Sequence, residues 1–351
     1  MENRPIAIVY NEPVEREDPC FEASRDILDQ VEAVEHSLTR LGVPSVRVAF
    51  TRNLRSFIHK IEKGGVRYAF NLCESVDEDP ELVPHPAAVM EILGISYTGS
   101  SAVTLALTTD KLVTKQLLKA KGIPTPRCET YDGSLPPRLK PFSFPIIVKP
   151  RFQDASIGID QDSVFASDEE LRQRLPEFHD RFGPLILEEY VPGREFNMSL
   201  FGYPTPRLLP TAEISFDELP RGIYPIVGYK AKWDKKSFEY HHTPRVFPRD
   251  LPYTLERKIH QTALRCFQYF MLRDYGRVDM RVDHSGGVYV LEINANPCIS
   301  PDAGFPAALA EAGISYKEFV YRLLQFVQSR EQKVEHAAYH RQKTTGYRAK
   351  Q

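Results

Sequence analysis

The stretch GRVDMRVDHSGGVYVLEINANP, residues 276–297, decides the fold because it contains two strand patterns and a turn. GRVDMRVD and VYVLEIN each alternate apolar and polar residues, and Ser and Gly separate them, which predicts a β-hairpin. We centre the turn on Ser285 and Gly286, so that Asp283 faces Val288. The pairing of every other residue in the two strands follows from that turn.

The polar residues of this hairpin are expected to share one face. In a strand, residues two apart point to the same side. Asp279 then faces Glu292 and Arg277 faces Asn294, so all four side chains project together. The opposite face is apolar and is expected to cover the core with Val278, Met280, Val282, Tyr289, Leu291 and Ile293. One face of the hairpin is therefore core, and the other carries polar groups.

Two carboxylates that oppose each other in a hairpin repel, so we expect a cation between Asp279 and Glu292. Two carboxylates and an amide oxygen suit Mg²⁺, which completes its shell with water and phosphate oxygens. In the alternative interpretation, both acids face solvent and pair with Arg277 and Arg281. The hairpin alone leaves both interpretations open.

The first hundred residues alternate strand and helix patterns. PIAIVY, SVRVAF, RYAFNLC and ISYTGS have the character of short buried strands. The first intervening helix is expected to end at Gly42 and to bury the face formed by Ile27, Val31, Val34, Leu38 and Leu41. This alternation predicts a doubly wound parallel sheet. No G-x-G-x-x-G motif follows the first strand, so we expect no dinucleotide there.

Three features in the middle of the chain suit a nucleotide, although each also has an ordinary interpretation. Lys149 ends an apolar strand, where its ammonium can reach a phosphate or simply lie on the surface. The loop QDASIG, with Ser156 and Gly158, can fold over phosphates or be only a loop. LILEEYVPGREF can present its edge to adenine and the carboxylates of Glu188 and Glu195 to ribose, or be a hairpin with surface acids.

Composition excludes several classes of function. The formal net charge of the 351 residues is −2, so there is no basic field for nucleic acid. No apolar run reaches the length of a membrane span, and the acidic, weakly apolar start predicts no secretory signal. The five cysteines are an odd number at irregular spacings, which favours reduced thiols. We therefore expect a cytoplasmic protein that binds neither nucleic acid nor a membrane.

Taken together, the motifs resemble those of the ATP-grasp ligases, and they are most similar to those of the D-alanine-D-alanine ligases and their uncharacterised relatives. YTGS, DK, VKP, EEYVPGREF, GRVD and LEIN occur in the family's order between about residues 67 and 325. The resemblance implies an N-terminal doubly wound domain and two α+β subdomains that clasp ATP. The expected domains are residues 1–104, 105–194 and 195–330, followed by a polar tail at 331–351.

The resemblance also implies roles for individual residues in binding the ATP phosphates. Lys111 and Lys149 would contact the phosphates, and Lys232 in YKAKW would reach the terminal ones. Ser156 and Gly158 would lie in a loop that closes over them as a lid. Ser156 and Lys232 thereby count among the expected catalytic residues.

For the rest of the site, the resemblance places adenine against Glu188 and the backbone at Val191, and the ribose against Glu195. The metal, Mg²⁺ or Mn²⁺ in its place, would be bound by Asp279, Glu292 and Asn294. Arg277 would act as a catalytic residue by steadying the charge on the reacting carboxyl group. Relatives are often dimers, so a homodimer is expected from the family alone.

The positions that bind amino acids in the family differ here. VYNEPVEREDPC and NLCESVDEDPE replace two family loops. Trp233 stands in place of a tyrosine, Cys298 of a glycine, and Ala303 of the serine that holds the second D-alanine. We therefore expect a ligase that joins a small-molecule carboxylate to an amine through an acyl phosphate, with substrates other than two D-alanines. The alternatives are a D-alanine-D-alanine ligase and a non-catalytic ATP-binding regulatory protein.

Overall fold

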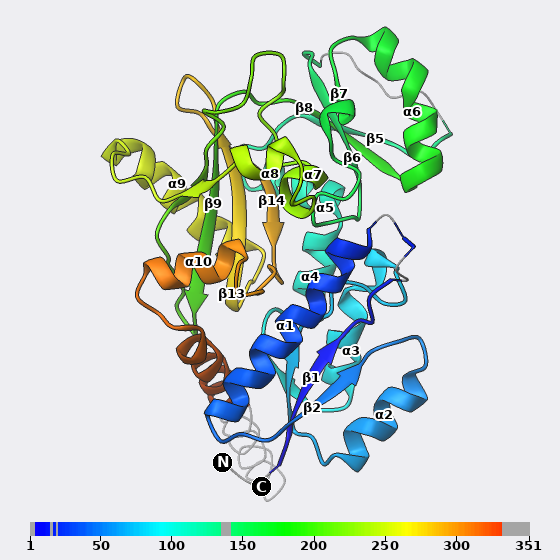
Figure 1. Ribbon diagram of the computed structural model, residues 1–351, viewed down its shortest axis with the longest axis vertical. Coiled ribbons are helices and arrows are strands. Elements are labelled where there is room, and N and C mark those ends of the chain that lie inside the picture. Colours follow the sequence, from blue (N-terminus) through cyan, green and yellow to red (C-terminus); the bar gives the residue numbers. More distant parts are fainter. Residues whose placement is uncertain (1–3, 15–16, 19, 135–141, 332–351) are drawn as a thin grey trace, which may run out of the picture.

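The computed structural model describes residues 4–14, 17–18, 20–134 and 142–331. Three β-sheets follow one another along the long axis of the molecule, with the N-terminal sheet at one end (Figure 1). Of the polar tail expected at 331–351, all but Glu331 lies outside the described residues. Among the described residues, no helix combines the length and apolarity needed to cross a bilayer.

The N-terminal sheet is parallel, with strand order β2-β1-β3-β4. Its elements are β1 (Ile6–Tyr10), α1 (Phe21–Arg40), β2 (Ser45–Ala49), α2 (Leu54–Lys63), β3 (Tyr68–Asn71), the 3₁₀ turn η1 (Pro80–Leu82), α3 (Pro84–Ile92) and β4 (Ser96–Tyr97). Ile6 and Ile8 pack in the same core as α1, whereas Ala7 and Val9 pack in the core of α2 and α3. Helices therefore cover both faces, and the expected doubly wound sheet is confirmed.

The central sheet is antiparallel and has the order β5-β8-β6-β7. Its elements are β5 (Cys128–Tyr131), β6 (Ile146–Pro150), η2 (Gln161–Ser163), β7 (Val164–Phe165), α6 (Asp168–Phe182) and β8 (Leu185–Glu189). Two helices, α4 (Ala102–Thr109) and α5 (Lys111–Ala120), precede it. They are separated at Asp110, whose side chain caps α5 and also binds Arg151 at 2.6 Å. This cap fixes the start of α5, where Lys111 lies.

The third sheet has the order β12-β11-β9-β13-β14, and β10 pairs with β9. Its strands are β9 (Arg194–Gly202), β10 (Arg207–Leu208), β11 (Ala212–Ile214), β12 (Arg245–Val246), β13 (Asp274–Val282) and β14 (Val288–Asn294). The helices of this region are α7 (Tyr229–Trp233), α8 (Phe238–His242), α9 (Tyr253–Tyr269), α10 (Gly304–Glu311) and a last helix at 316–331.

The two faces of the third sheet have different neighbours. Met198, Val278 and Met280 pack with α9 in one core. On the opposite face, Phe201 and Tyr275 pack with α10, the last helix and α1 at one end of the sheet. Figure 1 shows α10 in orange in front of β9 and β13, and α1 in blue below them. The remainder of that face carries the polar residues of the hairpin.

The predicted pairing of this hairpin is confirmed for the residues that matter most and is wrong near the turn. Arg277 faces Asn294 and Asp279 faces Glu292, as expected. A β-bulge follows, so that Val282 rather than Asp283 faces Val288. The bulge inserts one extra residue in β14 between Val290 and Glu292.

The bulge also changes which residues of β14 are buried. Val288 and Val290 enter the core, whereas Tyr289 and Leu291, which we expected there, are only half-buried. Because the side-chain period of a strand is two, one extra residue reverses the facing of everything beyond it.

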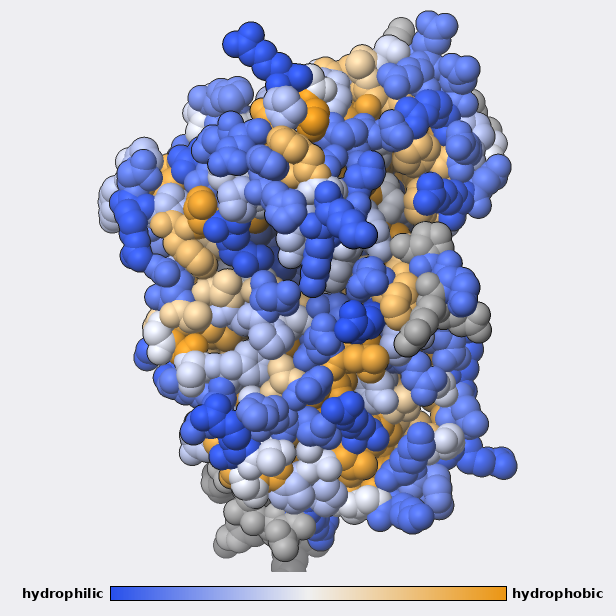
Figure 2. Space-filling model, in the orientation of Figure 1, coloured by the Kyte–Doolittle hydropathy of each residue, from blue (hydrophilic) through white to orange (hydrophobic). Residues whose placement is uncertain are grey.

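The surface is mixed. Figure 2 shows a mostly hydrophilic face, on which apolar residues reach the surface in small groups separated by polar ones.

Candidate active site

The polar face of the hairpin forms a connected cluster around Asp279. Nε and Nη2 of Arg277 each donate to one carboxylate oxygen of Asp279, both at 2.8 Å. Asn197 of β9 donates to Oδ1 at 2.9 Å, and Asn294 donates to Oδ2 at 3.0 Å. Asn294 also donates to Oε1 of Glu292 at 3.2 Å. The sequence predicted four members of this cluster but not Asn197, which comes from a strand 82 residues away.

Asp279 and Glu292 differ strongly in acidity. Burial alone would raise the pKa of Glu292, but the positive charges of Lys111, Lys232 and Arg277 outweigh it and hold that pKa well below the usual range. For Asp279, burial and the nearby charge of Glu292 raise the pKa to about 6, in spite of Arg277. The second of two adjacent carboxyl groups resists ionisation because the first is already charged. A further cation would therefore favour the fully ionised pair.

The side chains present fit a hard divalent cation. Mg²⁺ in proteins takes one or two carboxylates and leaves its other positions to water and phosphate oxygens. Glu292 accepts from Asn294 through Oε1, and its carboxyl group contacts that of Asp279, which it faces across the hairpin. No group of three or more His, Cys, Asp and Glu ligands forms among the described residues. The donor set therefore suits a metal that shares its shell with phosphate rather than one enclosed by protein alone.

The alternative interpretation of the hairpin is correct in part. Arg277 does pair with Asp279, as that interpretation required. Arg281 pairs instead with Glu195 of β9, at 2.9 Å. Asp279 is thus ion-paired, whereas Glu292 forms no ion pair among the described residues, and its role as a metal ligand stays a prediction.

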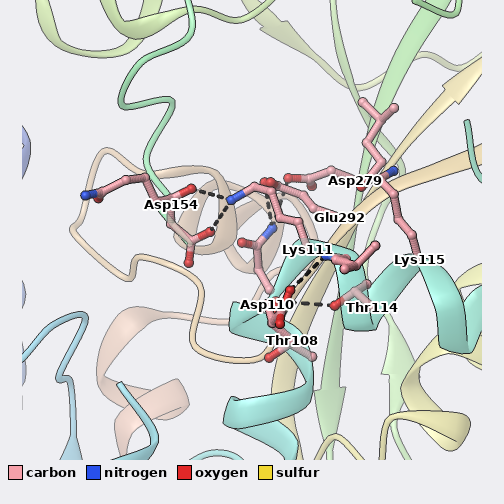
Figure 3. A network of polar contacts seen from close by, with 12 residues as sticks. Thr108, Asp110, Lys111, Thr114, Lys115, Asp154, Asp279 and Glu292 are labelled. Carbon is pink, nitrogen blue, oxygen red and sulfur yellow. Dashed lines mark hydrogen bonds and ion pairs between the residues drawn. The ribbon is translucent and has the colours of Figure 1, made fainter. Parts of the chain in front are cut away.

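Lys111 extends from the start of α5 toward the carboxylate cluster (Figure 3). Its ammonium donates to the carbonyl oxygen of Gln153 and lies 3.5 Å from Oδ1 of Asp154. The side chain of Asp154 is 60% exposed, so solvent screens this contact. A loop carboxylate thus lies beside Lys111, one of the cations that the resemblance assigns to phosphates.

The loop that carries Asp154 is tied to the segment around α7. Ser156 is buried, and its hydroxyl donates to the carbonyl of Val227 at 2.8 Å. Trp233 donates from its ring nitrogen to the carbonyl of Ala155 at 2.8 Å. The backbone of Ser156 has a φ of +61° and that of Gly158 a φ of +73°. In this structure the Ser156 hydroxyl therefore holds the loop down on the α7 segment, a role that the sequence did not reveal.

Glu188 is buried beneath two lysines. Nζ of Lys149 donates to Oε2 of Glu188 at 3.1 Å, and Nζ of Lys115 lies 3.2 Å from Oε1. Lys115 is 0% exposed and also donates to Thr125 at 3.0 Å and to the carbonyl of Leu291 at 3.2 Å. The sequence analysis missed Lys115, although it lies one helical turn after Lys111, on the same side of α5.

The charges in this buried group balance only in part. Burial would raise the pKa of Glu188, but Lys115 and Lys149 outweigh it and lower that pKa. Burial lowers the pKa of Lys115 more than Glu188 raises it.

Glu195 has a firm partner in the third sheet. Arg281 binds its carboxylate through Nε at 3.0 Å and Nη2 at 2.9 Å. The same guanidinium donates to the carbonyls of Gly193 and Pro225. Val191 lies partly buried in the turn that connects β8 to β9. The assignments of Glu188 and Val191 to adenine and of Glu195 to ribose stay predictions.

A second polar cluster joins α1 to the segment after β14. Asp26 accepts from the thiol of Cys298 at 2.9 Å and from the hydroxyl of Ser300 at 2.6 Å. Gln30 donates to Glu74 at 2.8 Å. Burial raises the pKa of Glu74 to about 7, and it raises the pKa of the Cys298 thiol well above its ordinary value. Cys298 is therefore a neutral thiol rather than a thiolate nucleophile.

A family model described as the D-ala D-ala ligase C-terminus matches residues 133–325, which is more than half of the chain. The chain belongs to this ligase family. It is 33% identical to the D-alanine-D-alanine ligase of Thermotoga sp. over 68% of this chain and 73% of that protein. It is also 30% identical to an uncharacterized protein of Sinorhizobium fredii over 73% of each chain. The fold of this ATP-grasp ligase accordingly matches a solved D-alanine-D-alanine ligase.

That solved structure is the D-alanine-D-alanine ligase of Bacillus anthracis complexed with ATP. The TM-score is 0.74 at 20% identity, and the alignment covers 94% of this chain and 99% of the other. The expected ATP-grasp fold is thereby confirmed.

Two of the family positions that differ in this ligase have clear surroundings. Ala303 caps α10 and makes no side-chain hydrogen bond there. Trp233 uses its ring N–H to hold the loop at Ala155. Lys232 lies next to Trp233 in α7, and its charge acts on Glu292. The structure thus brings together Lys111, Lys232, Arg277, Asp279, Glu292 and Asn294, while Lys149 and Glu188 form their own buried pair.

Proposed function

We propose that this ATP-grasp ligase joins a small-molecule carboxylate to an amine, with ATP converted to ADP and phosphate. One observation carries the proposal: lysines from α5 and α7 and the guanidinium of Arg277 converge on a carboxylate pair that fits Mg²⁺. Cations and a metal gathered in a partly enclosed site suit phosphoryl transfer, in which catalysis consists mainly of positioning and charge stabilisation.

In this proposal, ATP lies between the central and third sheets. Support comes from the solved relative of Bacillus anthracis, whose structure is a complex with ATP. Lys111 and Lys232 face the terminal phosphates once Asp154 gives way, and Lys149 faces the phosphates from β6. Adenine contacts Glu188 and the backbone at Val191, and ribose contacts Glu195. Asp279, Glu292 and Asn294 would hold Mg²⁺, or Mn²⁺, which would neutralise phosphate charge when bound.

The reaction has two steps. An oxygen of the substrate carboxylate attacks the γ-phosphorus, the bond to the β-phosphate oxygen breaks, and an acyl phosphate and ADP form. The nitrogen of the amine then attacks the acyl carbon, inorganic phosphate leaves, and the amine proton goes to phosphate or solvent. Arg277 stabilises the oxygen that carries negative charge in the second step. The segment with Ser156 and Gly158 excludes water, which would otherwise hydrolyse the acyl phosphate.

The substrates are proposed to differ from two D-alanines. Ala303 offers no hydroxyl at the start of α10, and Trp233 commits its only donor to the loop backbone. A binding site that lacks the hydrogen-bonding group a ligand requires gives that ligand little advantage over others. A D-alanine-D-alanine ligase with altered contacts remains the second candidate because of the family itself.

We place the protein in the cytoplasm, because all five cysteines are free thiols. A homodimer also stays a prediction. Ile92, 84% exposed at the end of α3, and Val103, 58% exposed on α4, are apolar residues that such an interface could cover.

The test is ATP turnover with Mg²⁺ against a panel of D- and L-amino acids and small carboxylic acids. Hydroxylamine is added to capture each acyl phosphate as a hydroxamate. We expect ADP, phosphate and a hydroxamate with at least one carboxylate, and no hydroxamate with Asp279→Asn. ATP binding without turnover for any carboxylate would instead favour the non-catalytic regulatory protein. Efficient dipeptide formation from D-alanine alone would identify the second candidate.

A further inference from the structure

Arg245 is a cation without a partner near the candidate active site. It lies on β12, the edge strand of the third sheet, and is half-buried. Its Nε is buried and makes no hydrogen bond, and no ion pair to Arg245 occurs among the described residues. By contrast, Arg277 pairs with Asp279, Arg281 with Glu195, and Arg330 with Asp274. The exception is notable because an unpaired buried charge is costly.

The surroundings of Arg245 are themselves positive. Burial is the main cause that lowers the pKa of Arg245, and the like charge of Arg277 is the next. Nε and Nη2 lie 3.3 Å from the point where a side chain on Gly304 would begin, so the guanidinium rests against the start of α10. Asp302 and Cys298 act in the opposite direction, but Asp302 is exposed and is not within ion-pair distance.

The start of α10 adds to this excess of positive charge. The first N–H groups of a helix carry partial positive charge, so they favour anions and disfavour cations. α10 begins at Gly304, and its capping residue Ala303 offers no side-chain acceptor to those N–H groups. Arg245, Arg277 and the start of α10 therefore make three positive contributions to one region, and among the described residues no carboxylate forms an ion pair with Arg245.

We propose that Arg245 binds a carboxylate of the substrate other than the carboxylate that is phosphorylated. This inference rests on the proposed ligase function and names the chemistry of its substrate. A carboxylate bound there would accept from the two-donor edge of the guanidinium and lie at the start of α10. It belongs either to the amine substrate, as in an amino acid, or to a dicarboxylic acyl substrate. Arg245 would thus select for a second acidic group in the substrates.

The experiment uses the full chain and the variants Arg245→Gln and Arg245→Lys. Arg207→Gln, at an exposed position on β10, is the matched control. Hydroxamate formation measures the acyl substrate alone, because hydroxylamine bears no carboxylate. Complete ligation is then measured with amino acids and with their amides as the amine. Urea unfolding of every variant checks that its fold is intact.

We expect R245Q to raise the KM of the acidic substrate at least tenfold, with little change in kcat, while R207Q behaves as the wild type. R245K should recover part of the loss. If the carboxylate belongs to the amine, amino acids lose affinity, and their amides and hydroxamate formation are unaffected. If it belongs to a dicarboxylic acyl substrate, the KM in hydroxamate formation rises, but only for dicarboxylates. Equal effects of R245Q on acidic and neutral substrates would overturn the proposal.

A binding measurement separates this inference from the ligase proposal. Wild type and R245Q are titrated calorimetrically with amino acids, dicarboxylic acids and the matching amides, in the presence of ADP and Mg²⁺. Turnover is not required, so a protein that forms no acyl phosphate still reports on Arg245. We expect at least one acid to bind the wild type tenfold more tightly than its amide, and R245Q to lose this preference. A wild type that prefers no acid over its amide contradicts the inference.

Discussion

Replacing Glu188 with Gln tests whether buried charge pairing stabilises the central sheet. Glu188 is 1% exposed and Lys115 0%, with Lys149 as the second partner at 3.1 Å. The substitution keeps the shape of the side chain but leaves the buried ammonium of Lys115 and the partly buried ammonium of Lys149 without a negative partner. Removing one member of a buried pair costs about 3–5 kcal/mol. We expect about 3 kcal/mol, because Lys115 keeps its hydrogen bonds to Thr125 and Leu291.

Urea unfolding at pH 7 measures this loss, which corresponds to a midpoint lower by roughly 1 M or less, because the dependence of stability on urea is steep for a chain of this size. The matched control is Glu35→Gln, because Glu35 pairs with Arg47 at the surface, with side chains 35% and 42% exposed. That change should cost at most about 1 kcal/mol. A deficit in E188Q no larger than that in E35Q would refute the reasoning.

The pH dependence of the E188Q deficit gives a second check with a definite sign. Burial already places the pKa of Lys115 below its ordinary value of 10.5. A lysine with a lowered pKa in the folded state binds fewer protons there than in the unfolded state, so stability rises with pH. The deficit of E188Q should therefore be smaller near pH 10 than at pH 7. In the wild type, the lowered pKa of Glu188 means that its contribution is lost as pH falls below about 4.5.

Three further predictions concern the loop and the α1 cluster. Asp154→Asn removes the carboxylate 3.5 Å from Lys111, so calorimetry should show ATP binding up to about fivefold tighter; weaker binding would contradict this. Gly158→Ala should lower ATP turnover about tenfold, because a Cβ there comes within 2.6 Å of Pro150 at a φ of +73°; wild-type turnover would count against it. The pKa of Glu74, raised to about 7, means that stability falls by roughly 1–3 kcal/mol between pH 4.5 and 7. Unfolding midpoints should show a smaller fall in Glu74→Gln than in the wild type, because the raised pKa of Asp279 contributes to the fall in both.

The hairpin shows how much of a strand pairing the local sequence pattern can predict. Alternation and a Ser-Gly turn sufficed to place Asp279 opposite Glu292, because a side-chain period of two leaves only two choices of face. The bulge before Glu292 was not predictable, since an extra residue within VYVLEIN leaves the local composition unchanged. The two strands were therefore predicted correctly near the cluster and one residue out of register at the turn.

Contacts over long sequence separations were beyond the sequence analysis. The alternating pattern places Arg281 on the polar face of its strand but names no partner for it. Only the pairing of β13 with β9 brings it to Glu195, 86 residues away. The pattern of an amphipathic helix predicts that Lys115 faces solvent, yet its side chain is fully buried. In both cases the partner comes from a different strand or sheet, so no local periodicity contains the information.

The buried ammonium of Lys115 also constrains how this molecule can move. It holds Glu188 in the central sheet and the carbonyl of Leu291 in the third sheet, two sheets that share no strand. Separating the sheets at this point would break both contacts of a fully buried ammonium, which is far more costly than bending a loop. Lys115 therefore ties the central sheet to the third sheet at this point, although the two sheets share no hydrogen-bonded strand pair.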